Sequence, residues 1–238
     1  MLRSNEPTLG TILLKTKGSI AAVLENDWLM LSQERHWFVR ETLGYLRRTL
    51  ARLDVSSRSF FAVIDRGSCF AGTLLELALA ADRSYMLALP EGDNDAPRIA
   101  LSEVNLRPFE MVTGATRLQN RFCGEGVPIA AVTRRQGEPL DHAAAMALGL
   151  VTFAPDELDW EHELRLAVEE RASLSPDALS GLEASLRFPG GESMESRIFA
   201  RLSAWQNWIF NRPNATGEQG ALKRFGTGSK PAFSWERV

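Results

Sequence analysis

The chain has 238 residues, of which 45% are hydrophobic and 24% are charged. These values are ordinary for a globular protein, and the length suffices to bury a core without disulfides or metals. With 27 Lys and Arg against 30 Asp and Glu, the net charge is only -3, which argues against a nucleic-acid-binding surface. No apolar run is long enough for a membrane span, and the N-terminus lacks a secretory pattern. Cys69 and Cys123 match no metal-ligand spacing, so we expect reduced thiols, no metal site and a cytoplasmic location.

The first 64 residues are predicted to contain two strands around a long helix. Residues 11–16 (TILLKT) have the pattern of a short buried strand that ends at Gly18-Ser19. Between about 32 and 53, apolar side chains recur at alternating spacings of four and three, which predicts an amphipathic helix. The segment 61–64 (FAVI) then has the pattern of a buried strand.

The next stretch continues this alternation. The almost wholly apolar segment 73–81 is predicted to be a helix, and 84–89 a strand. The acidic segment 91–97 is predicted to be a loop, after which 99–104 resumes a strand pattern. Later predicted elements are a helix at 140–148, a strand at 150–153, and amphipathic helices at 161–171 and 194–210.

Single strands that alternate with helices indicate an α/β fold in which helices pack on a sheet. The chain changes character after Glu157, where charged amphipathic helices replace the alternating pattern. We therefore expect three parts: an α/β core over 1–157, a helical, dimerising region over 158–211, and an extended tail over 212–238.

Glu76 is the most informative residue, because it is the only carboxylate between Cys69 and Ala81. Burying a lone carboxylate is costly unless it is paired or protonated, and groups perturbed in this way gather at functional sites. A purely structural salt bridge with Arg83, seven residues further on, is the alternative. The spacing leaves both interpretations open.

Gly72 lies at the predicted turn before this helix. A glycine turn that leads into a helix N-terminus offers backbone N–H groups, which can stabilise a developing oxyanion. A carboxylate one turn into that helix could act as acid or base beside the polarised carbonyl.

The segment VIDRGSCFAGTLLELALAADRSYML (63–87) resembles the signature of the crotonase, or enoyl-CoA hydratase/isomerase, superfamily. Downstream, Ser102-Glu103-Val104 lies where that superfamily has Pro-Glu-Val/Ile, TGATRL (113–118) resembles its GGTQRL, and 139–152 resembles its later helix and strand. The similarity covers residues 60–155 in register. It implies a crotonase-like spiral of ββα units followed by C-terminal helices, with the N-terminal part of that fold truncated.

In that superfamily, a thioester carbonyl lies between two backbone N–H donors and two carboxylates work on the acyl group. The resemblance implies Glu76 and Glu103 as the carboxylates, Thr73 and Ala21 as the donors, and Gly72 as the substrate-binding turn. It implies no cofactor beyond the coenzyme A of the substrate.

A narrower resemblance joins 63–87 with SSRSFFAVID (56–65) and the closing GTGSKPAFSWERV (226–238). Together they resemble the C-terminal half of a subgroup of ring-opening CoA-thioester lyases, which act on epoxy- or dihydrodiol-benzoyl-CoA in benzoate degradation. In that subgroup the N-terminal half holds the catalytic glutamates, and the C-terminal half is a scaffold that helps to form the dimer. The resemblance implies an acyl-CoA or benzoyl-CoA-derived substrate, with a second copy or the N-terminal catalytic half as partner, and neither nucleic acid nor membrane.

Several departures from the superfamily pattern favour a structural role. The usual Gly-Gly-Gly is Gly72-Thr73-Leu74, the small-Gly-Ala oxyanion loop is replaced by 18–22 (GSIAA), and the Gly-Pro-Gly-Gly loop by 106–111 (LRPFEM). Each lost oxyanion donor typically removes about 2.7–4 kcal/mol of transition-state stabilisation. We therefore expect this chain alone to be inactive. The alternative is an autonomous hydratase or isomerase that uses Glu76 and Glu103.

Two C-terminal features have competing interpretations. The apolar stripe around Trp205 and Trp208 favours packing against another subunit over stacking on a cofactor. Lys223, Arg224 and Lys230 could contact coenzyme A phosphates, but a solvated tail is the simpler interpretation.

Overall fold

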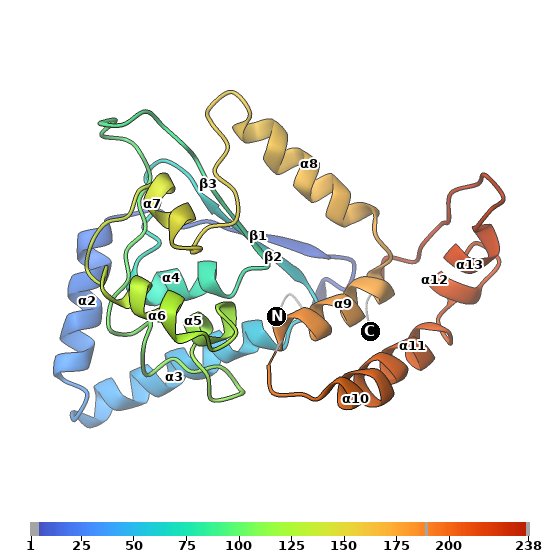
Figure 1. Cartoon of the computed structure of the whole chain (residues 1–238), viewed down its shortest axis with the longest axis horizontal. Helices are drawn as coiled ribbons and strands as arrows, with labels where there is room; N and C mark the ends of the chain where they lie inside the picture. Colours follow the sequence, from blue (N-terminus) through green and yellow to red (C-terminus); the bar gives the residue numbers. More distant parts are fainter. Residues whose placement is uncertain (1–4, 189, 237–238) are drawn as a thin grey trace. The chain divides into compact units, whose positions relative to one another are not determined.

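The computed structural model describes residues 5–188 and 190–236 (Figure 1). A three-stranded sheet has the order β1-β2-β3, with β1 at Thr11–Leu14, β2 at Ser59–Ile64 and β3 at Arg83–Met86. Strands β2 and β3 are parallel, with Phe61 opposite Arg83 and Ile64 opposite Met86. The mixture of parallel strands and helices confirms the predicted α/β class.

Helices make up most of the remaining regular structure. Their bounds are α2 Ile20–Ser32, α3 Trp37–Asp54, α4 Gly72–Leu79, α5 Arg117–Arg121, α6 Gly126–Thr133, α7 His142–Ala147, α8 Trp160–Ser173, α9 Pro176–Arg187, α10 Met194–Ser196, the π-helical segment η1 Arg197–Leu202, α11 Ser203–Ile209, α12 Pro213–Thr216 and α13 Ala221–Arg224.

The chain forms two compact units. Among the described residues, one consists of 13–56 and 60–167, and the other of 5–12, 57–59, 168–188 and 190–236. The division of the chain into 1–157, 158–211 and 212–238 stays a prediction. The tail at 212–238 was predicted to be extended, but it contains the short helices α12 and α13. Residues 1–4, 189, 237 and 238 of the predicted parts lie outside the described residues.

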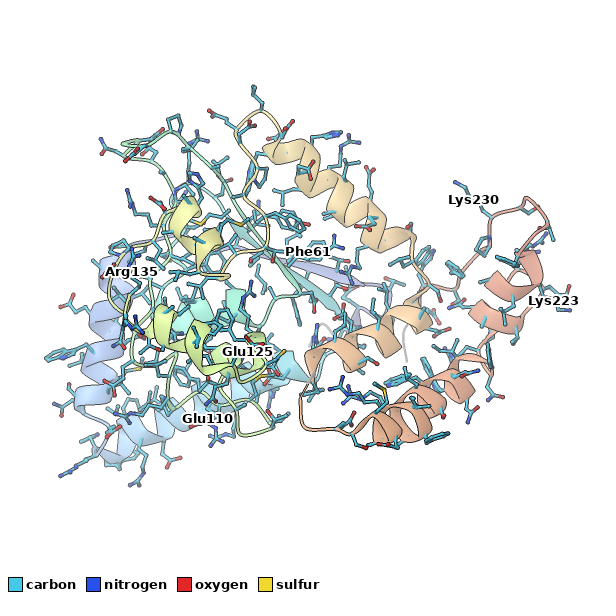
Figure 2. All side chains as sticks on the ribbon, viewed as in Figure 1. Phe61, Glu110, Glu125, Arg135, Lys223 and Lys230 are labelled. Carbon is cyan, nitrogen blue, oxygen red and sulfur yellow. The ribbon has the colours of Figure 1, made fainter. Side chains whose placement is uncertain are left out.

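The core of the larger unit is built on β2. All six residues of this strand are buried, as expected for a strand of a parallel sheet that is covered on both faces. Phe61, labelled in Figure 2, is fully buried and contacts Tyr85 of β3 edge to face, with ring centroids 5.9 Å apart. Tyr85 in turn stacks on Phe153 at 5.1 Å. Such aromatic packing gives a rigid base for the helix that follows β2.

A second apolar cluster joins α3 to the loop after the sheet. Leu43 and Leu50 of α3 pack with Val104 and Phe109, and Leu77 of α4 lies against them. The cluster fixes the segment around residue 104 beside α4, and this positions the site described below.

The smaller unit has a polar centre. Glu183 of α9 is 1% exposed and lies 3.3 Å from both Arg171 and Arg187. The Ser59 hydroxyl donates to the same carboxylate at 2.5 Å. On another face of α9, a side chain at Gly181 would come within 3.5 Å of the Trp205 ring of α11. This unit is therefore held by a buried ion cluster and by tryptophan packing.

Four predicted elements differ in the structure. The helix predicted at 32–53 begins only at Trp37, because the chain turns at 33–36 and His36 is extended; the separate helix α2 precedes that turn. The strands predicted at 99–104 and 150–153 are reduced to isolated bridges, Ile99 with Leu140 and Tyr85 with Phe153. Strand β1 is half-buried instead of buried, with Leu13 43% exposed.

Among the described helices, none combines the length and apolar character that crossing a bilayer requires.

Candidate functional site

The predicted glycine turn lies between β2 and α4. Gly72 has φ +42°, in the left-handed region that glycine adopts without strain, and its N–H donates to the Ala100 carbonyl at 2.9 Å. Helix α4 starts there, and Glu76 lies one turn in with 1% of its surface exposed. The turn and the burial of Glu76 are therefore confirmed.

Both carboxylate oxygens of Glu76 accept hydrogen bonds inside the protein. Arg117 Nη1 donates to Oε2 at 2.8 Å, and Asn105 Nδ2 donates to Oε1 at 2.7 Å. Arg117 also donates through Nη2 to the two oxygens of Asp54 at 2.9 and 3.1 Å. The side chains of Asp54, Arg117 and Glu76 are each only 1% exposed, so the three form a buried ion triad.

The suggested salt bridge between Glu76 and Arg83 is wrong. Arg83 lies in β3, where its guanidinium is 5.8 Å from the centre of the Phe61 ring. The real partner is Arg117, 41 residues away in sequence, at the start of α5. A separation of seven residues would put two side chains on one stripe of a continuous helix, but α4 ends at Leu79 before it reaches residue 83.

Burial raises the pKa of Glu76, while the Arg117 charge and the hydrogen bonds from Asn105 and Arg117 oppose that rise. The raised pKa means that the folded protein binds the Glu76 proton more tightly than the unfolded chain does. With a donor on each oxygen, the carboxylate is held in one orientation within the triad. This arrangement links α4 to α3, to α5 and to the loop at Asn105.

The N–H of Thr73, the predicted oxyanion donor, is occupied by another carboxylate. It donates to Asp27 Oδ2 at 2.9 Å, and the Thr73 hydroxyl donates to Oδ1 at 2.5 Å. The Ser102 hydroxyl also donates to Oδ2, at 2.8 Å. Asp27 belongs to α2 and is 1% exposed. A Cβ atom on Gly72 would lie 1.6 Å from Asp27 Oδ2, so the carboxylate rests directly against the turn.

Ala21, the second predicted donor, is in a different local structure from the one expected. The loop predicted at 18–22 is the beginning of α2, with Ser19 as the N-cap residue; its side chain accepts from Ala22 N at 3.4 Å. Ala21 is thus in the first helical turn and is exposed.

Glu103, the second predicted carboxylate, lies at the surface. Its side chain is 48% exposed and accepts from Arg107 Nε at 3.0 Å and Nη2 at 2.7 Å. Arg107 also pairs with Glu34 at 3.2 Å. Glu103 and Arg107 line a pocket of about 370 Å³ together with Asp27 and Ser102. Glu76 and Glu103 therefore have different partners and very different exposure to solvent.

Sequence reasoning missed Asp27 and Arg117. The signal for Asp27 was its helical spacing: it follows Leu24 by three residues and precedes Leu31 by four, so a lone acid shares a face with two leucines. Arg117 lies inside the segment TGATRL that carried part of the resemblance, but no local pattern connected it with Glu76.

Comparison with known proteins agrees with the resemblance seen in the sequence. No protein-family model matches the chain. A benzoyl-CoA-dihydrodiol lyase from Aromatoleum evansii is 59% identical over 237 residues, which is 100% of this chain but 42% of that protein. The chain thus spans less than half the length of that relative.

Solved structures with the same fold are more distant in sequence. An enoyl-CoA hydratase from Geobacillus kaustophilus is 17% identical, with a TM-score of 0.64 over 97% of this chain and 95% of that one. Pseudomonas aeruginosa AtuE is 15% identical, with a TM-score of 0.67 over 99% and 85%. The chain therefore has the crotonase fold, and it is similar over its whole length to the C-terminal part of benzoyl-CoA-dihydrodiol lyase.

Proposed function

We propose that this chain is the mainly structural, dimerising half of a ring-opening CoA-thioester lyase that acts on 2,3-epoxy- or dihydrodiol-benzoyl-CoA in benzoate degradation. The proposal rests on the hydrogen bonds and the burial of Glu76. Its two oxygens are engaged by Arg117 and Asn105, and only 1% of the residue is exposed.

Acid–base catalysis requires a carboxylate within hydrogen-bonding reach of the atom that gains or loses a proton. Glu76 has a donor on each oxygen, and releasing it toward a substrate would leave Arg117 with Asp54 alone in a buried site. The polarisation of a thioester carbonyl requires free N–H donors, whereas the N–H of Thr73 already bonds to Asp27. The Glu76 carboxylate and the Thr73 N–H, which thioester chemistry would need, are therefore both engaged in hydrogen bonds within the protein.

The helix that comprises α10, η1 and α11 supports the dimerising part of the proposal. Trp205 lies against α9 at Gly181 within the chain. Large apolar side chains on the same helix, and Phe210 directly after it, are exposed: Met194 68%, Ile198 42%, Phe199 77%, Leu202 54% and Phe210 47%. An apolar surface of this kind suits an interface with another crotonase-type chain, either a second copy or the remaining part of the longer lyase.

The tail supports a solvated role more than a contact with coenzyme A phosphates. Lys223 is 3.6 Å from Glu218, and Arg224 donates to Gln219 within the same short segment. In Figure 2, Lys223 and Lys230 point away from the ribbon.

Turnover assays test the catalytic part of the proposal. The purified chain is incubated with crotonyl-CoA, to detect hydration, and with dihydrodiol- or epoxy-benzoyl-CoA, to detect ring opening. We expect no turnover of either. Turnover that disappears in Glu103→Gln would instead establish the autonomous hydratase or isomerase, an alternative favoured by the position of Glu103 in the pocket.

Sedimentation velocity tests the assembly part. We expect the chain to associate with itself or with the co-expressed remaining part of the lyase, and Phe199→Asp to weaken that association. Asn207→Asp is the matched control, because it adds the same charge at an exposed position of α11. Equal association of the two variants would contradict an interface on this helix.

A further inference from the structure

We propose that Asp27 is an internal ligand, which fills the oxyanion position of this fold with its own carboxylate and so closes the adjoining pocket to thioesters. The oxyanion position is here the set of three donors formed by the Thr73 N–H, the Thr73 hydroxyl and the Ser102 hydroxyl. The inference rests on the proposed structural function and gives a physical reason for it.

The hydrogen bonds are those of a bound anion. Oδ2 accepts from the Thr73 N–H at 2.9 Å and from Ser102 at 2.8 Å, while Oδ1 accepts from the Thr73 hydroxyl at 2.5 Å. The N–H belongs to the first turn of the eight-residue helix α4, whose dipole favours a negative charge there. Asp27 is 1% exposed, so these bonds form where water competes little.

The fit of the carboxylate against the turn is the second observation. A Cβ atom on Gly72 would lie 1.6 Å from Oδ2 and 2.9 Å from Cγ of Asp27. The carboxylate thus lies in the space that a thioester oxygen would need in order to reach the Thr73 N–H. The absence of a side chain at residue 72 makes room for a ligand that α2 itself supplies.

The pocket lined by Glu103 and Arg107 also reaches the Asp27 side chain. Asp27 and Ser102 both line it, together with the apolar side chains of Leu24, Trp28 and Leu31 from the same helix as Asp27. A neutral carbonyl that entered the pocket would have to displace a charged acceptor already tethered beside the donors, and charge-assisted bonds are the stronger ones. A developing enolate would in addition be repelled by Asp27. The pocket is therefore closed at the point where thioester chemistry would take place.

Chemical rescue tests the proposal on the full chain. Asp27→Gly removes the side chain and leaves the three donors facing a cavity, and acetate restores the missing methylene carbon and carboxylate together. We expect Asp27→Gly to melt at a lower temperature than the wild type, and acetate to restore most of the loss in a saturable manner. The matched control is Asp27→Leu, which removes the same charge but fills the space, and sodium chloride controls for ionic strength.

Acetate that stabilises Asp27→Gly no more than Asp27→Leu would overturn the proposal. In case Asp27→Gly does not fold, hydrogen exchange on the wild-type chain gives an independent readout: the Thr73 amide is expected to be strongly protected, and its proton resonance is expected to move upfield in Asp27→Asn. Rapid exchange at Thr73 in the wild type would equally overturn it. Turnover of crotonyl-CoA by the wild type would defeat the proposed function as well, whereas failed rescue without turnover would defeat only the assignment of Asp27, so the two failures are distinguishable.

Discussion

Replacing Arg117 with Met tests whether the buried triad is structural. Arg117 is 2% exposed and donates to Glu76, to Asp54 and to the Phe109 carbonyl. Methionine is unbranched and uncharged, and although it is shorter than arginine it keeps much of the packing volume. It leaves two carboxylates buried without the cation that they share.

Breaking a buried ion pair by removing one partner typically costs about 3–5 kcal/mol, because an uncompensated charge is left behind. The lost bond to the Phe109 carbonyl adds to this penalty, since an unsatisfied buried acceptor costs about 1–3 kcal/mol. We therefore expect Arg117→Met to lower the free energy of unfolding by at least about 3 kcal/mol at neutral pH.

The penalty is expected to shrink in acid. Without Arg117, whose charge lowers the pKa of Glu76, burial raises that pKa further, so the folded variant binds a proton that the unfolded chain releases. A group with a raised folded pKa stabilises fully below its unfolded pKa and loses that contribution as the pH rises through the folded pKa. Within that window, the free energy of unfolding of the variant should increase by about 1.4 kcal/mol per pH unit of acidification through Glu76.

Urea unfolding followed by circular dichroism, from neutral pH down to about pH 5, measures both effects. Arg107→Met is the matched control, because Arg107 forms ion pairs with its side chain 51% exposed, and exposed pairs typically contribute less than about 1 kcal/mol. A loss for Arg117→Met no larger than that of the control, or one that does not change with pH, would refute the structural role of the triad.

Three further predictions concern the same unit. Gly72→Ala should lower the free energy of unfolding by about 2–5 kcal/mol, because alanine is strained in the left-handed region and its Cβ atom overlaps Asp27. Its denaturant midpoint should fall far more than that of Gly114→Ala, where a Cβ atom meets open space. Because the pKa of Glu76 is raised from 4.5, stability relative to Glu76→Gln should be greatest below pH 4.5 and decline as the pH rises through the folded pKa; urea titrations that show the opposite slope would contradict the sign. Asp141→Ala removes the cap that accepts from Ala144 N at 2.8 Å, so thermal melts should show a loss of about 0.5–2 kcal/mol, whereas an unchanged melting temperature would contradict the cap.

Local chemistry made much of the larger unit predictable. The run FAVI at 61–64 contains only residues that suit a strand buried on both faces, and β2, which extends back to Ser59, is buried throughout. The glycine turn at residue 72 and the burial of Glu76 followed from similarly short-range features. Elements that depend on long-range packing were less accessible: the apolar segments at 99–104 and 150–153 looked like strands, but they form only isolated bridges.

The candidate site shows the same limit more sharply. The sequence identified Glu76 as unusual but not its partner, because Arg117 approaches from 41 residues away and only the folded chain brings the two together. The role of Asp27 was harder still to predict, because it depends on the packing of α2 against the turn at Gly72. A single acid on an apolar helical face was visible in the sequence, but the donors that it satisfies were not.

Asp27 and Glu76 would respond differently to an attempt to introduce thioester chemistry into this chain. Removing Asp27 would free the Thr73 N–H and open the pocket, but it would leave Glu76 paired with Arg117 and Asn105. Binding of a thioester and its turnover are therefore separable here. We expect Asp27→Gly to gain measurable binding of crotonyl-CoA by calorimetry and still to show no hydration, because Glu76 stays bonded to Arg117 and Asn105 and Glu103 is held by Arg107. Hydration by Asp27→Gly that requires Glu76 would mean that the triad releases its carboxylate, and the assignment of Glu76 to structure alone would then be wrong.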